Sequence, residues 1–210
     1  MINILDDCPE SDLIAAFHGQ DAVVRTIAAL NASAKVRMIK ATLQASVRRF
    51  IPAEFGLETR NTESLALIPT MADKVAILDE LIAHESKHFS CTAITTGVSF
   101  DWGIKSALLH YDLAPRMVLT LNGGETLFSA TSLAIIGTAV VRTLKREEMT
   151  RNKTLFIQSF TTSQNAILTA LEKNTGHSWA VERQGEATFI EDSQKRWREG
   201  NVRGLFDTTL

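Results

Sequence analysis

Short apolar stretches alternate with helical patterns through the first half of the chain. Runs rich in β-branched and other apolar residues predict buried strands over 2–5, 22–27, 50–51 and 91–96. Between them, apolar residues at helical spacing predict helices between Pro9 and Gly19, over 34–45 and over 74–83. Strands that alternate with helices are typical of a parallel sheet with helices on both faces. The pattern therefore predicts an α/β fold.

Within the predicted helix 34–45, the spacing of Val36, Ile39, Lys40 and Leu43 suggests one common face. Residues 52–70 contain Pro52, Gly56 and Pro69 and are predicted to form a loop.

The pattern changes after Gly97. Residues 117–129 alternate around Asn122-Gly123-Gly124, which predicts a hairpin. A helix is expected over 132–144 and a strand over 154–159. Thr162 or Ser163 can cap a further helix that runs to Lys173 and stops at Gly176. The polar stretch 186–210 predicts a helix followed by a frayed end.

Composition narrows the class of protein. The chain has 210 residues, 45% of them hydrophobic, which is enough for one sizeable core. Its net charge is −2, so it lacks the excess positive charge that is typical of nucleic-acid-binding proteins. Arg48 and Arg49 are predicted to be solvated. Cys8 and Cys91 do not make a disulfide framework, so a reducing, cytoplasmic compartment is expected. The first residues lack the regions of a signal peptide, and the apolar runs are too short to span a bilayer.

Four motifs carry a family resemblance. They are Gly-Gln-Asp-Ala-Val-Val at 19–24, Arg-Phe-Ile-Pro-Ala-Glu-Phe-Gly at 49–56, Thr-Gly-Val-Ser-Phe-Asp-Trp-Gly at 96–103, and Gly123-Gly124 followed by 128–131 and 136–137. Together they resemble the fungal isoflavone reductase-like family, which belongs to the NmrA-like atypical short-chain dehydrogenases. The resemblance covers most of residues 2–175, and the motif at 49–56 is the most specific part of it.

The resemblance implies an arrangement of regions as well as a fold. It implies a partial Rossmann-like parallel sheet that lacks the first strand-helix-strand unit, because the family's G-x-x-G-x-x-G turn is not among these residues. We expect an NAD(P)-binding region over 1–97, a small substrate-side region over 98–185 and a C-terminal helix over 186–210, within one structural domain. The strand at 22–27 should then be an exposed sheet edge through which the chain can form homo-oligomers.

The resemblance also implies site residues. Lys74 matches the family's general acid/base, whereas the spacing alone favours an exposed lysine on the first turn of a helix. The expected cofactor-binding residues are Ile27, Ala28, Ala29, Glu54, Phe55 and Gly97. Phe100 and Trp102 are expected to contact the substrate, although core packing is the commoner role of such aromatic residues.

Other catalytic constellations are incomplete. Tyr111 is followed four residues later by Pro115, so the Tyr-x-x-x-Lys pair of ordinary short-chain dehydrogenases is missing. His84 and His88 are expected to share a helix face, but no third ligand accompanies them, and we predict no metal site.

By resemblance, the predicted function is an NADPH-dependent oxidoreductase of secondary metabolism that reduces a small aromatic or polyketide-like molecule. Binding of NADPH is expected to be weak without the glycine-rich turn. The alternatives are a non-catalytic NmrA-like protein that senses dinucleotides and binds regulators, or an inactive truncated remnant.

Overall fold

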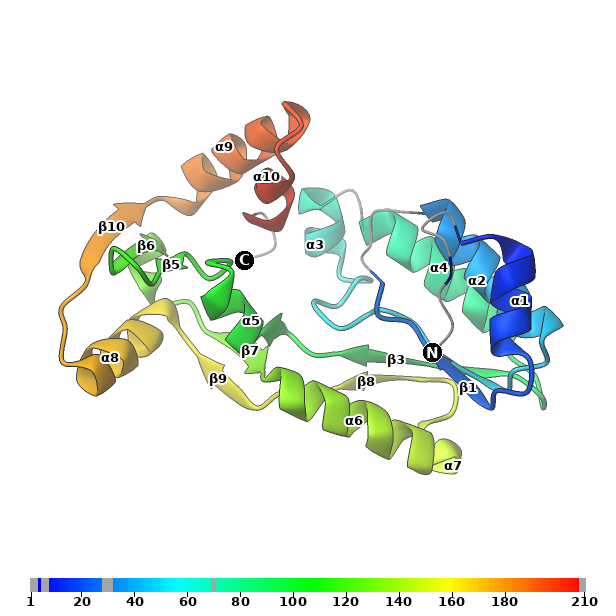
Figure 1. Cartoon of the computed structure of the whole chain (residues 1–210). Helices are drawn as coiled ribbons and strands as arrows, with labels where there is room; N and C mark the ends of the chain where they lie inside the picture. The colour runs from blue at the N-terminus through cyan, green and yellow to red at the C-terminus, as the bar shows by residue number, and fades with distance from the viewer. Residues whose placement is uncertain (1–3, 5–7, 28–31, 69–70, 208–210) are drawn as a thin grey trace. The chain divides into compact units, whose positions relative to one another are not determined.

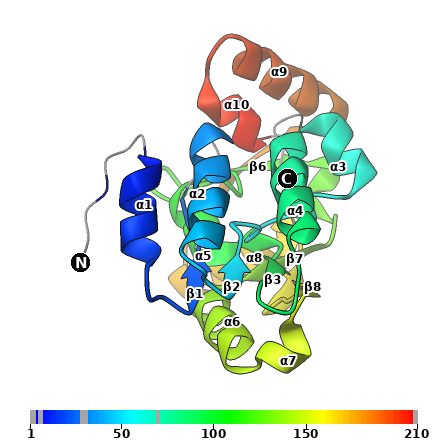
Figure 2. The same cartoon turned by 90° about the vertical axis from the view of Figure 1, so that its right-hand side faces the viewer.

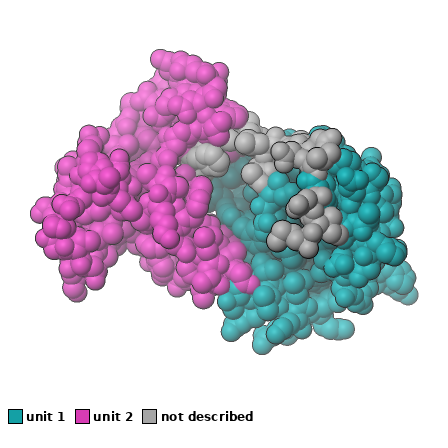
Figure 3. Space-filling model, viewed as in Figure 1, with its two compact units in different colours: residues 1–65, 69–95, 138–156 teal, residues 66–68, 96–137, 157–210 magenta. Residues whose placement is uncertain are grey.

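The computed structural model describes residues 4, 8–27, 32–68 and 71–207 (Figure 1). The chain forms two compact units, coloured separately in Figure 3. Unit 1 comprises residues 1–65, 69–95 and 138–156, and unit 2 comprises 66–68, 96–137 and 157–210. The three regions expected from the sequence stay a prediction.

Unit 1 is built on a parallel sheet with the strand order β1-β2-β3-β8. The strands are β1 (Ala22–Val24), β2 (Arg49–Ile51), β3 (Ser90–Thr95) and β8 (Lys153–Phe156). β2 and most of β3 are buried, as expected for central parallel strands covered on both faces. The predicted α/β fold is therefore confirmed, and β1 is the edge strand of this sheet within the described residues.

Helices cover both faces of the unit 1 sheet. The helices are α1 (Glu10–Phe17), α2 (Ala32–Gln44), α4 (Met71–Ala83), the part of α6 (Leu133–Lys145) from Thr138 onward, and α7 (Glu147–Thr150). Right-handed crossovers from β1 to β2 and from β2 to β3 place α2 and α4 on the same face of the sheet. Figure 2 shows α6 on the opposite face. Ile39 of α2 and Leu81 of α4 pack with Phe50 of β2 in a core of buried side chains.

Three local predictions for unit 1 fail. A short helix, α3 (Thr62–Leu67), begins inside the stretch predicted to be a loop. Helix α4 ends at Ala83, so His84 and His88 do not share a helix face. Arg49 is only 3% exposed, because its side chain lies along the sheet among hydroxyl groups instead of reaching solvent. The strand predicted over 2–5 lies outside the described residues apart from Ile4, which is in no strand.

The buried face of α2 also differs from the predicted one. Val36 and Lys40 are exposed, whereas Lys35 is buried together with Met38 and Ile39. The helix is rotated relative to the predicted face because α1 and α4 both pack against it. A lysine therefore occupies a core-facing position.

Unit 2 contains two small sheets. The first sheet consists of β10 (Ala180–Gln184), β6 (Met117–Leu121) and β5 (Tyr111–Asp112). The second sheet consists of β4 (Val98–Ser99), β7 (Phe128–Thr131) and β9 (Phe160–Thr162). The predicted hairpin is therefore wrong, because β6 and β7 belong to different sheets and η1 (Asn122–Gly124) links them.

The helices of unit 2 follow the sequence signals more closely. They are α5 (Phe100–Lys105), α8 (Gln164–Thr175), α9 (Glu186–Arg198) and α10 (Val202–Asp207). Ser163 caps α8 by accepting a 3.2 Å hydrogen bond from the Ala166 N–H, and Gly176 ends it with a φ of 71°. The end of the chain is not frayed as far as Asp207, which pairs with Arg196 and Arg203 at 2.8 Å. No helix in the described part is long and apolar enough to cross a membrane.

Candidate active site

The candidate site lies where β1 and β2 end. Ligands of open parallel α/β sheets bind outside the carboxyl ends of the strands. Arg25 directly follows β1, and its N–H donates a 2.9 Å hydrogen bond to the Ile51 carbonyl, which fixes it beside the end of β2. Beyond β2 the chain turns tightly, since the Glu54 N–H donates to Pro52 O at 2.8 Å and the Gly56 N–H to Glu54 O at 2.6 Å. These turns place Glu54 at the same edge.

Glu54 is a buried and anchored carboxyl group. It is 4% exposed, and its Oε2 accepts a 2.7 Å hydrogen bond from the Thr59 hydroxyl, which is itself buried. Because the Thr59 hydroxyl is its one side-chain donor among the described residues, this carboxylate can also interact with the cations around it.

Helix α4 brings Lys74 into the electrostatic neighbourhood of Glu54 and Arg25. The side chain is half-buried, and burial lowers the pKa of Lys74 below its usual value. The charge of Glu54 opposes this change and that of Arg25 adds to it. A lysine whose pKa moves toward neutrality can give up and regain a proton during a reaction. Lys74 thus has the environment that a general acid/base requires.

A second lysine joins this site from α2. Lys35 is 2% exposed, and within the described residues its Nζ has no hydrogen-bond partner. Burial lowers the pKa of Lys35, and the charges of Arg25 and Lys74 lower it further, while Asp73 and Glu54 raise it. We refer to Arg25, Lys35 and Lys74 as the cation cluster.

Sequence reasoning missed Lys35 and Arg25. Lys35 lies four residues before Ile39 and seven before Thr42, and all three are buried. Residues at this spacing lie on one face of a helix. A lysine on the same face as Ile39 could therefore have indicated a buried, functional side chain. Arg25 carried a similar signal, because it is a charged residue inside the run 22–27 that predicts a buried strand.

Among the described residues, the structure does not bring the other predicted cofactor-binding residues of unit 1 into the cation cluster. Ile27 is 48% exposed, and Phe55 is half-buried beside Glu54 in the loop after β2. Ala28 and Ala29 lie outside the described residues. The structure therefore brings together Lys74 and Glu54 among the predicted residues of this unit.

Gly97, Phe100 and Trp102 belong to unit 2. Gly97 has a φ of 62°, and a Cβ there would lie 2.4 Å from the Ser129 carbonyl oxygen, so this position requires glycine. Phe100 makes an edge-to-face contact with Phe160, with ring centroids 5.0 Å apart, whereas Trp102 is 46% exposed. Their roles in binding stay predictions.

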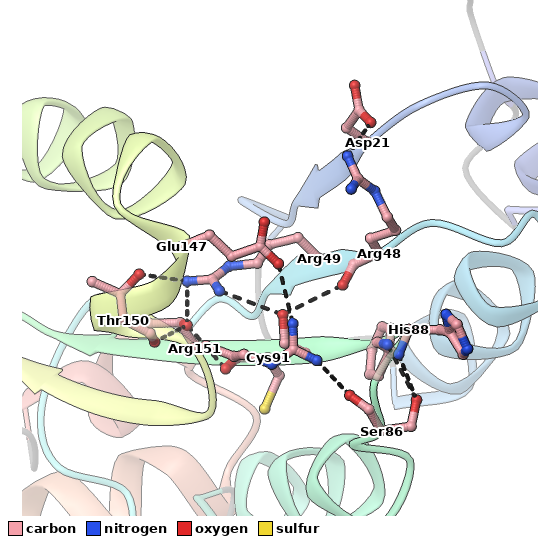
Figure 4. A network of polar contacts seen from close by, with 12 residues as sticks. Asp21, Arg48, Arg49, Ser86, His88, Cys91, Glu147, Thr150 and Arg151 are labelled. Atoms are coloured by element: carbon pink, nitrogen blue, oxygen red, sulfur yellow. Dashed lines mark hydrogen bonds and ion pairs between the residues drawn. The ribbon is translucent and has the colours of Figure 1, made fainter.

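A polar network lies at the opposite, amino edge of the unit 1 sheet (Figure 4). Arg49 donates 2.7 Å hydrogen bonds to the hydroxyls of Thr92 and Thr150. Nearby, an open pocket of about 500 Å³ is lined by Ser86, Lys87, Glu147, Glu148 and Arg151. Since reactants bind at the carboxyl ends of parallel strands, we assign this network to the structure of the sheet.

Known proteins share both sequence and fold with this chain. The oxidoreductase aprR of Aspergillus flavus is 37% identical over 178 residues, which are 84% of this chain and 60% of aprR. The crystal structure of isoflavone reductase matches with a TM-score of 0.75 and 22% identity, over 96% of this chain and 67% of that one. The chain has the fold of isoflavone reductase. The partial Rossmann-like sheet predicted from the sequence is thus confirmed, and the similarity to aprR and the shared fold support the family resemblance.

A second solved structure also shares the fold of this chain. AtPrR2, solved with NADP⁺ and (+)-pinoresinol, matches with a TM-score of 0.77 and 19% identity, over 95% of this chain and 66% of that one. No family model matches the chain. The chain spans about three fifths of the length of aprR.

Proposed function

We propose that this chain acts as an NADPH-dependent oxidoreductase that reduces a small aromatic or polyketide-like secondary metabolite in the cytoplasm. One observation carries this proposal: Lys74 is half-buried near Glu54 at the carboxyl edge of the sheet, and burial lowers its pKa. The oxidoreductase aprR and the NADP⁺ complex of AtPrR2 support the class of reaction.

The described residues suit an anionic dinucleotide. The orphaned ammonium of buried Lys35 and the guanidinium of Arg25 supply positive charge at the edge where such cofactors bind. The residues that would hold the cofactor are Ile27, Ala28, Ala29, Glu54, Phe55 and Gly97. NADPH supplies a hydride when bound. Because the glycine-rich turn that binds a pyrophosphate is not among the 210 residues, we expect a dissociation constant weaker than micromolar.

Lys74 would donate the proton in this reaction. Its ammonium would hydrogen-bond the substrate oxygen that gains negative charge and transfer a proton to it. Glu54 would keep the ammonium form populated before the transfer, because its carboxylate raises the pKa of Lys74 against the effect of burial. Phe100 and Trp102 would shape the substrate pocket.

The test follows deuterium from NADPH labelled at C4 into a panel of aromatic ketones and enones, detected by mass spectrometry. We expect label in at least one product with the parent chain and a large loss of label with Lys74→Ala. Lys40→Ala is the matched control, because Lys40 is an exposed lysine on α2. Equal labelling by parent and Lys74→Ala would remove Lys74 from the mechanism. Calorimetric binding of NADPH without label in any product would favour the non-catalytic dinucleotide sensor.

We also propose that β1 mediates self-association. Its outer edge has no strand partner among the described residues, and open sheet edges pair readily with other strands. Sedimentation of the parent chain should show oligomers that Val24→Lys reduces, since a lysine on an edge strand opposes pairing. A monomer at all concentrations would count against this proposal.

A further inference from the structure

The cation cluster contains more buried positive charge than its carboxylates balance. Arg25 is 7% exposed and Lys35 is 2% exposed. Glu54 is the buried carboxyl group that acts on both, and the exposed Asp73 contributes only to Lys35. Buried charges are costly unless they are paired, so this arrangement favours an additional negative charge.

The side-chain donors of Lys35 and Arg25 are also used only in part by the described residues. The Nζ of Lys35 is enclosed and has no hydrogen-bond partner within the part of the chain that the structure describes. In that same part, the side-chain hydrogen bond of Arg25 is a long one of 3.4 Å to the Ile27 carbonyl. An ammonium offers three donors and a guanidinium five. The unused donors and the unbalanced charge thus indicate the same kind of ligand.

We propose that Lys35 and Arg25 form a binding site for an anionic oxygen group, a carboxylate or a phosphate, at the carboxyl edge of β1. Cationic N–H donors bind such oxygens through short, charge-assisted hydrogen bonds. The anion would sit in the electrostatic neighbourhood of Lys74, which places it on one of the reactants. It is either a phosphate of the dinucleotide or a carboxylate of the substrate, and this choice alone rests on the proposed function.

The test measures anion binding without turnover. Inorganic phosphate, benzoate and NADPH are titrated by calorimetry into the parent chain, Lys35→Met, Arg25→Gln and Lys40→Met. Lys35→Met should weaken binding of at least one probe by roughly tenfold or more, the loss expected for a hydrogen bond to a charged group. Without anion, Lys35→Met should melt about 2–4 °C higher than the parent, because a buried unpaired charge is replaced by an apolar chain. Lys40→Met should change neither quantity, since Lys40 is an exposed lysine on the same helix.

The probes distinguish the sources of the anion. Weaker binding of phosphate and NADPH, with benzoate unchanged, assigns the site to the dinucleotide. Weaker binding of benzoate alone assigns it to a substrate carboxylate. A parent chain that binds none of the probes, or equal binding by parent, Lys35→Met and Arg25→Gln, overturns the site. If Lys35→Met does not fold, Arg25→Gln decides. A failure of deuterium transfer leaves these binding results intact, so the two proposals fail separately.

Discussion

Replacement of Arg49 by alanine tests whether the network at the amino edge stabilises the fold. Arg49 links β2 to β3 and to α7, since its guanidinium donates 2.7 Å hydrogen bonds to the hydroxyls of Thr92 and Thr150. Arg48, the preceding residue, points to solvent and pairs with the exposed Asp21. The two neighbours therefore provide a matched pair of buried and exposed arginines.

The magnitude follows from the contacts of Arg49. The two short hydrogen bonds from this charged donor correspond to about 3–6 kcal/mol when each contributes about 1.5–3 kcal/mol. A third, longer hydrogen bond of 3.4 Å to the Ser90 hydroxyl adds little. The guanidinium is already desolvated, which lowers the pKa of Arg49, and within the described residues its Nε lacks a partner. The desolvation and the unpartnered Nε both reduce the net stabilisation that Arg49 contributes. We therefore expect Arg49→Ala to lower the free energy of unfolding by about 2–4 kcal/mol.

Urea unfolding at pH 7, followed by far-ultraviolet circular dichroism, which reports on the helices and strands of unit 1, measures this change. Arg48→Ala should leave the midpoint unchanged, because exposed ion pairs contribute little. Arg49→Met keeps most of the buried volume, so it should fall between Arg49→Ala and the parent. Equal midpoints for Arg49→Ala and Arg48→Ala would refute the reasoning. An Arg49→Met variant more stable than the parent would show that burial of the cation costs more than its hydrogen bonds return.

Three further predictions address single residues. Lys74→Ala should lower the rate of deuterium transfer roughly 10²–10⁴-fold. Lys74→Arg should not restore the rate, because a guanidinium stays protonated, and transfer by Lys74→Arg at the parent rate would contradict this. Gly97→Ala should lower the melting temperature in calorimetry, because the new Cβ would lie 2.4 Å from the Ser129 carbonyl oxygen and residue 97 has a φ of 62°. An unchanged melting temperature would show that the backbone shifts freely. Burial lowers the pKa of His110 from 6.5 to about 4 despite the nearby Asp207. As the pH drops from 6.5 to 4, His110 therefore binds a proton in the unfolded chain before it does so in the folded chain, and the free energy of unfolding should fall. His110→Gln should flatten this dependence in urea midpoints measured between pH 4 and 7, and an equally steep dependence would exclude His110 as its source.

The sheet of unit 1 was predictable because its strands are locally encoded. β2 and β3 contain apolar runs that suit burial on both faces, and the motif at 49–56 marks the loop that positions Glu54. The buried face of α2 was not predictable in the same way. Ile39 fits two overlapping helix faces, one with Val36 and Leu43 and one with Lys35 and Thr42, and only packing against α1 and α4 selects the second.

Strand pairing in unit 2 shows a different limit. Asn122-Gly123-Gly124 forms a turn with positive φ values, as its residue types predict. The turn does not pair the strands on either side, because β6 pairs with β10 from much later in the chain. A turn signal is local, whereas the partner of a strand depends on distant residues, and periodicity contains no information about them.

The division into two units has a consequence for how the chain folds. Neither unit is a continuous stretch of sequence, and β3 acquires β8 only after residues 96–137 of unit 2 have been synthesised. Pairings between strands so distant in sequence slow folding, because the loop between them must close before any contact stabilises it. A nascent chain that ends near Thr95 would present β3 as an open edge, so we expect the sheet to complete late. Expression of residues 1–95 alone should therefore give an aggregating fragment instead of an independent domain.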